Sequence, residues 1–86
     1  MDKRKYFFER GNARVSWDAA PEDAMWLCVD YNGMGRWWSE EPHPGLLLNW
    51  IDGAGEARPV HPVACAVGSR CDDWKSLKFK RPDEEE

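Results

Sequence analysis

The sequence predicts a mainly β protein, or an α+β protein with one short helical turn, built as a small twisted antiparallel meander or a partly closed barrel. Apolar and polar residues alternate over short stretches, Gly, Asn and Pro separate these stretches, and no long amphipathic helix pattern or internal repeat occurs. A chain of 86 residues suits one domain. We expect residues 1–82 to form that domain and the final "DEEE", residues 83–86, to be a disordered acidic tail.

The N-terminal third predicts a hairpin and one helical turn. The stretch "KYFFERGNARVSW" contains two short strands around Arg10-Gly11-Asn12, whose Gly and Asn tolerate positive φ. The following "DAAPEDA" predicts a single helical turn, with Asp18 as the cap and Pro21 in the first turn.

A second hairpin follows and contains the clearest strand, "AMWLCVDY". Its alternation places Leu27 and Val29 on one face, with Trp26, Cys28 and Asp30 on the other. Asn32-Gly33 is a strong hairpin signal, and "RWWSEE" is expected to return as the partner strand.

The remainder of the chain predicts shorter strands. "LLLNWI" is expected to be a strand, "DGAGEARP" a loop, and "VHPVACAV" a strand that Pro62 confines to an edge or a bulge. In "WKSLKFKRP", the alternation turns Leu77 and Phe79 inward and Lys78 and Lys80 outward.

Charge is distributed in blocks along the chain. The net charges of residues 1–15, 16–56, 57–82 and 83–86 are +3, −7, +4 and −4, which together give −4. A solvated surface explains this pattern, and so does an acidic face that docks on a basic surface of a partner. The longest uncharged apolar run, Leu46–Ile51, is too short to cross a bilayer, and three cysteines without a C-x-x-C pair suit a reducing compartment. We therefore expect no membrane contact and a cytoplasmic location.

The sequence gives little support for a metal site, a catalytic site or a nucleic-acid-binding site. The available metal ligands are Cys28, Cys65, Cys71, His43 and His61, whose spacing matches no common zinc motif. No metal, cofactor or enzymatic activity is predicted, because no acid–base dyad or oxyanion hole is evident. The aromatics and a basic strand are compatible with nucleic-acid binding, but the pI near 5.1 argues against direct binding.

The adjacent indoles of Trp37 and Trp38 carry the functional hypothesis. Neighbouring residues on a strand point to opposite faces, so one of these indoles is expected to meet something other than the core. The sequence does not indicate which one is buried, and the alternative is that both sheet faces are covered and every indole belongs to the core. An aromatic and acidic partner-binding patch would consist of Trp37, Trp38, Glu40, Glu41, Asp30, Trp26 and Asp52.

Two segments resemble a pattern in small accessory proteins of tailed phages and prophages. "SWDAAPEDAMWLCVDYNGMGRWWSEEP", Ser16 to Pro42, is similar to their W-x-x-A-P-E-x-A opening and Trp-rich return strand. "DDWKSLKFKRP", Asp72 to Pro82, is similar to their D-W-(R/K)-x-S-L-x-x-R-P ending, although it lacks one residue before Ser76. The resemblance implies viral origin, a location in the cytoplasm of a host, and an anti-defence role such as that of anti-CRISPR proteins, rather than an activity.

The resulting expectation is a non-enzymatic inhibitor, a monomer or small homo-oligomer, that binds a host defence complex. A CRISPR effector is favoured, since an acidic face can compete with phosphates for its Lys and Arg residues. One alternative is a nucleotide-signal sponge, in which Trp74 stacks on a base and Lys75 and Arg70 hold phosphates. Another is a small virion or assembly component.

Overall fold

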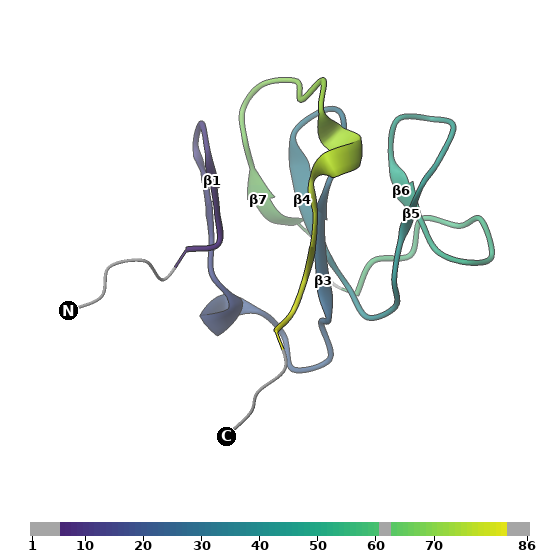
Figure 1. The fold of residues 1–86 in the computed structure, drawn as a ribbon, viewed down its shortest axis with the longest axis horizontal. Coiled ribbons are helices and arrows are strands. Elements are labelled where there is room, and N and C mark those ends of the chain that lie inside the picture. The colour runs from purple at the N-terminus through teal and green to yellow at the C-terminus, as the bar shows by residue number, and fades with distance from the viewer. Residues whose placement is uncertain (1–5, 61–62, 83–86) are drawn as a thin grey trace.

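The structure is a computed structural model that describes residues 6–60 and 63–82. A central antiparallel sheet has the strand order β7 (Val63–Ala66), β4 (Met34–Trp38), β3 (Trp26–Val29) and β8 (Lys78–Lys80). One hairpin, β1 (Phe8–Arg10) and β2 (Ala13–Val15), lies on one side of this sheet, and another, β5 (His43–Pro44) and β6 (Trp50–Ile51), lies on the other side (Figure 1). The prediction of a mainly β fold is confirmed, and the described strands do not close into a barrel.

The two 3₁₀ turns of the described chain are η1 (Trp17–Ala19) and η2 (Trp74–Ser76). A helical turn was predicted in residues 18–24 with Pro21 in its first turn, whereas η1 ends at Ala19, before Pro21, and its cap is Ser16. The placement of Pro21 in a helical turn was therefore wrong. The Asp18 backbone N–H donates to the Ser16 hydroxyl over 3.1 Å. A Ser hydroxyl satisfies a free helical N–H in this position as well as an Asp does, so the capping assignment to Asp18 was wrong.

The β3–β4 hairpin is the centre of the fold and follows its sequence pattern. Leu27 pairs with Trp37 and Trp26 pairs with Trp38, so each face of the sheet receives one of the adjacent indoles. The turn between the strands contains Gly33 at φ 86°, a conformation that strains any residue with a Cβ. The predicted alternation and the predicted turn are both confirmed.

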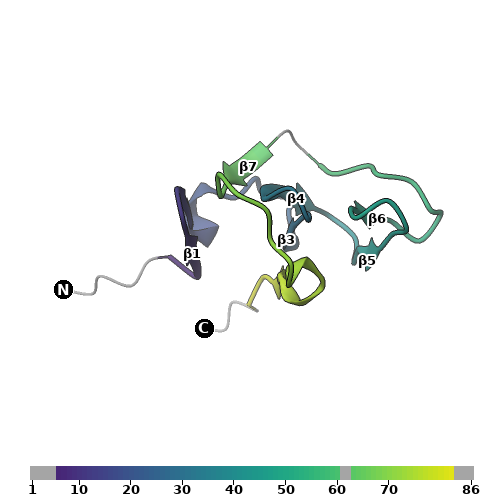
Figure 2. The ribbon, with the colours of Figure 1, turned by 90° about the horizontal axis from the view of Figure 1, so that it is seen from above.

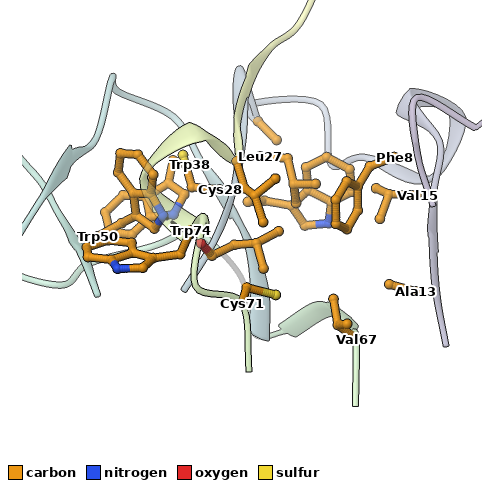
Figure 3. Packing of buried hydrophobic residues seen from close by; sticks show 14 residues of the cluster. Phe8, Ala13, Val15, Leu27, Cys28, Trp38, Trp50, Val67, Cys71 and Trp74 are labelled. Carbon is orange, nitrogen blue, oxygen red and sulfur yellow. Dashed lines mark hydrogen bonds between the residues drawn. The ribbon is translucent and has the colours of Figure 1, made fainter. Parts of the chain in front are cut away.

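We call the side of the central sheet that carries Leu27, Val29 and Trp37 the first face. Rings from the N-terminal segment cover it: Trp17 lies 5.4 Å from Trp37, and Phe7 stacks on Trp17 at 4.5 Å. The ring of Phe79 from β8 joins this cluster (Figure 3 shows its neighbours Phe8 and Val15 beside Leu27). This face is therefore sealed by the β1–β2 hairpin and η1.

The second face carries Trp26, Cys28 and Trp38. Trp50 of β6 and Trp74 of η2 cover it, in an edge-to-face contact with 5.5 Å between ring centres. Figure 3 shows Cys28, Trp38, Trp50 and Trp74 gathered as a group separate from the Phe8 group. The small domain thus buries apolar side chains on both sides of one sheet.

The two outer strands of the central sheet differ in their surroundings. Just beyond β7, the Val67 carbonyl accepts a hydrogen bond from the Asn12 N–H in the β1–β2 turn, over 3.0 Å. β8 lies at the opposite margin and presents Lys78 and Lys80. The prediction that the strand around Cys65 is an edge strand is confirmed, while Pro62, His61 and the predicted tail at 83–86 lie outside the described residues.

The strand predicted for "LLLNWI" is wrong in its first half. Only Trp50 and Ile51 form a strand, while residues 46–48 lie in the loop between β5 and β6 (Figure 2). Pro44 and Gly45 precede the leucines, and the Gly45 N–H donates to the Asn49 carbonyl over 2.7 Å, which closes a tight hairpin. Within the described part of the chain, no helix has the length and apolarity that spanning a bilayer requires.

Candidate protein-binding surface

Trp37 and Trp38 do point to opposite faces, but both are buried. Their exposed fractions are 5% and 2%, so the prediction that one indole meets a partner is wrong. The physical reason is that each face has its own cover, Trp17 over Trp37 and the Trp50 group over the second face. The alternative in which both faces are covered is the one observed.

Trp38 nevertheless has an unusual environment. Its indole Nε1–H is buried and has no hydrogen-bond acceptor among the described residues. The side chain also lines a hollow of about 280 Å³, together with Ser39, Glu40, Asp52 and Arg58. A buried N–H without an acceptor costs free energy, so Trp38 is retained for its ring rather than for its polar group.

Asp30 was predicted to contribute to the patch, but it is buried and has a structural role. Its carboxylate accepts the Trp50 backbone N–H over 3.2 Å and lies 4.0 Å from the Arg36 guanidinium. Burial raises the pKa of Asp30, and these two contacts oppose the rise. Asp30 therefore attaches the β5–β6 hairpin to the end of β3 instead of facing a partner.

Asp52 likewise organises the chain around itself. One carboxylate oxygen accepts the N–H groups of Ala54 and Glu56, and the other accepts the Arg58 Nε–H over 2.7 Å. The Glu56 N–H and the Arg58 guanidinium lower the pKa of Asp52, with the backbone bond the larger cause. We call residues 43–58, which comprise the β5–β6 hairpin and this loop, the leucine lobe.

The predicted residues that remain at the surface are Glu40, Glu41 and, in part, Trp26. Glu40 and Glu41 are exposed, and Glu41 forms an ion pair of 2.6 Å with Lys78, which lowers the pKa of its carboxyl. Trp26 is half-buried, with the ammonium groups of Lys78 and Lys80 5.1 and 5.9 Å from its ring centre. The predicted patch is thus reduced to two carboxylates and part of one ring.

Sequence reasoning missed the most exposed apolar group of the described chain. Leu46, Leu47 and Leu48 are exposed by 100%, 84% and 49%, and we call these three residues the leucine ridge. The signal that could have identified them is the preceding Pro44-Gly45, which favours a turn over the continuation of a strand. A loop that displays three consecutive leucines is typical of an interaction surface.

The residues considered for zinc do not form a site within the described part of the chain. There, no group of three or more His, Cys, Asp or Glu side chains comes close enough to hold a metal ion. Cys28 and Cys71 are buried, and burial raises the thiol pKa of both Cys28 and Cys65. Neither Cys28 nor Cys65 therefore has the lowered pKa of a nucleophilic cysteine.

The residues assigned to a nucleotide sponge are arranged differently from the prediction. Trp74 is only 3% exposed, because it packs against Trp50, so its ring cannot stack on a base. Lys75 and Arg70 are exposed, but each guanidinium or ammonium group lies over a ring of its own chain, Lys75 over Trp74 and Arg70 over Tyr31. The proposed stacking role of Trp74 was wrong.

Comparisons with known proteins add no assignment: no family model, curated protein or solved structure matches the chain.

Proposed function

We propose that the protein is a non-enzymatic inhibitor that binds a host protein complex through the acidic segment 39–58, which contains the leucine lobe, and blocks the access of nucleic acid. A CRISPR effector is the favoured class of partner, on the basis of the resemblance of Ser16–Pro42 and Asp72–Pro82 to phage accessory proteins. Its nucleic-acid channel offers the Lys and Arg residues that an acidic surface would occupy.

The observation that carries the proposal is the charge of the lobe and of the residues leading into it. Residues 39–58 contain four carboxylates and one guanidinium, a net charge of −3 with neutral histidine. Lys78 pairs with Glu41 and Arg58 with Asp52, whereas no ion pair within 4 Å joins Glu40 or Glu56 to a base among residues 6–60 and 63–82. Glu40 and Glu56 therefore remain available to a basic partner.

Competition with nucleic acid tests this proposal. Fluorescence anisotropy of labelled target DNA, measured with a panel of purified guide-loaded CRISPR effectors, reports whether the protein blocks DNA binding. We expect inhibition by the wild-type protein, weakened about tenfold in the E40Q/E56Q variant because two charge contacts are lost. Inhibition should also weaken as the salt concentration rises.

The matched control removes two exposed carboxylates from the segment before β3. The E22Q/D23N variant changes the net charge by the same amount and leaves the leucine lobe intact. It should inhibit as well as the wild type. If both variants weaken inhibition equally, overall charge rather than the leucine lobe explains the inhibition, which would contradict the proposed surface. If no effector of the panel is inhibited, the proposed partner class is contradicted.

A further inference from the structure

Hydrogen bonds fix the conformation of the loop that carries the leucine ridge. The Tyr31 N–H donates to the Leu48 carbonyl over 3.2 Å, and the Gly45–Asn49 hydrogen bond closes the base of the loop. Behind it, the Trp50 indole donates its Nε1–H to the Val29 carbonyl over 2.9 Å. A preorganised loop loses little conformational entropy on binding, which favours affinity.

Backbone strain occurs within the same loop. Leu48 has φ 64°, and among the described residues other than glycine it alone has a positive φ. A leucine is disfavoured in this conformation, where Gly or Asn would fit better. One loop therefore combines an exposed apolar surface with a strained residue, and such strain is frequent at ligand-binding sites.

Hollows lie on both flanks of the ridge. The larger, about 520 Å³, is lined by Leu46 and Leu47 together with Ile51 and Glu56. The smaller, about 240 Å³, lies between Leu47, Leu48 and Tyr31. The larger hollow is within the size range of protein ligand sites and offers apolar walls with one carboxylate at its margin.

The charge around the ridge indicates what would cover it. The Glu56 carboxylate lines the larger hollow, and the base nearest in sequence, Arg58, is bonded to Asp52. A bilayer with anionic headgroups, or the same ridge of a second copy in a two-fold contact, would bring negative charge against Glu56 and Glu40. A protein segment that combines a large apolar side chain with a Lys or Arg satisfies both features of the surface.

We propose that the leucine ridge and its Glu56 hollow form a docking site for a segment of a partner protein in which a large apolar residue neighbours a Lys or Arg. The apolar residue occupies the hollow beside Leu46 and Leu47, and the base pairs with Glu56. The inference deepens the proposed function, on which it rests for the kind of partner, by naming the contact. Its test uses no CRISPR effector, so the two can fail separately.

The test is selection of a displayed random library of twelve-residue peptides on the full-length protein. We expect enriched peptides to share Leu, Ile, Phe or Met within four positions of a Lys or Arg. Isothermal titration calorimetry with the enriched peptides should show at least a tenfold loss of affinity for L46S/L47S, because burial of a leucine side chain alone contributes about that much. E56Q should lose affinity less and become insensitive to salt.

The control is V63S, which removes an apolar side chain of 43% exposure from β7, an element of the central sheet rather than the lobe. V63S should bind the peptides as the wild type does. Selection of no peptide, selection of peptides without a base, or unchanged binding by L46S/L47S would overturn the proposal. So would ridge-dependent dimerisation in sedimentation equilibrium, or ridge-dependent cosedimentation with phosphatidylcholine vesicles containing phosphatidylglycerol.

Discussion

The two hairpins that flank the central sheet use their apolar residues in opposite ways. The β1–β2 hairpin buries Phe8, Ala13 and Val15 against the first face, and the exposed positions of its two strands are charged. The leucine lobe buries Trp50 against the second face but leaves Leu46 and Leu47 almost fully exposed. The first hairpin thus completes the core, whereas the second contributes one indole to the core and displays its leucines.

The two hairpins also differ in the contacts that attach them to the rest of the fold. The turn of the β1–β2 hairpin is connected to η2 by a bidentate pair between Arg10 and Asp73, with distances of 2.7 and 3.0 Å. The leucine lobe is connected through buried polar contacts to the end of β3, from Trp50 to Val29 and to Asp30. A surface ion pair contributes little to stability, while a buried hydrogen bond is costly to break. We therefore expect the lobe, despite its exposed tip, to be held firmly.

The largest effect is expected from removing the indole beneath each hairpin. W37A and W38A should each lower the free energy of unfolding by about 3–5 kcal/mol, because both rings are buried. Hydrogen exchange should locate the damage, near β1–β2 for W37A and near Trp50 for W38A. Urea denaturation measures the loss, and a variant with wild-type stability would contradict the burial of that ring on its face.

An intermediate effect on stability is expected to distinguish Trp38 from Trp50, the two indoles buried at the second face. W50F removes the donor to the Val29 carbonyl, whereas W38F removes an N–H that has no acceptor among the described residues. The Val29 carbonyl lies at the end of the β3–β8 pairing. The Leu77 N–H, which would continue that pairing, donates to the Trp74 carbonyl instead, so the Trp50 indole supplies the donor to Val29. W50F should therefore be less stable than W38F by about 1–3 kcal/mol. Equal losses in thermal unfolding would mean that the Trp50 bond contributes nothing.

The smallest effect concerns the strained tip of the leucine lobe. L48G replaces the residue at φ 64° by one without a Cβ and should raise the free energy of unfolding by about 0.5–1 kcal/mol. L46G is the matched control, since Leu46 has no positive φ and glycine there adds only flexibility. Chemical denaturation distinguishes them, and a gain in L46G equal to that in L48G would show that strain is not the cause.

Most of the strands and turns of this fold could be predicted from the sequence, but the segments that pack on the two faces of the sheet could not. The alternation around Leu27 and the turn at Gly33 follow from neighbouring residues, and both were predicted correctly. The burial of Trp37 and Trp38 depends on Trp17 of η1 and Trp50 of β6, which lie outside the hairpin that contains the two indoles. Strand geometry fixed the opposite directions of the two indoles, yet it cannot determine what packs on either face.

The candidate site was predicted only in part, because most of its residues are placed by contacts that strand patterns do not reveal. Glu40 and Glu41 are exposed as expected, but Asp30 and Asp52 satisfy backbone N–H groups of their own chain. The Asp30 bond to Trp50 depends on where the chain returns in space, whereas the Asp52 bonds reach only two and four residues along the chain. The leucine ridge was mistaken for a strand because an apolar run alone does not distinguish a buried strand from an exposed loop.

The open margins of the central sheet bear on how the protein behaves in concentrated solution. The Asn12 turn occupies the residue after β7, and β8 carries the exposed Lys80, whose charge opposes pairing with a strand of another sheet. β7 is uncharged, so β8 is the margin at which charge disfavours pairing with another copy. We expect this charged margin to lower the tendency of a tryptophan-rich chain to grow into fibres by adding strands.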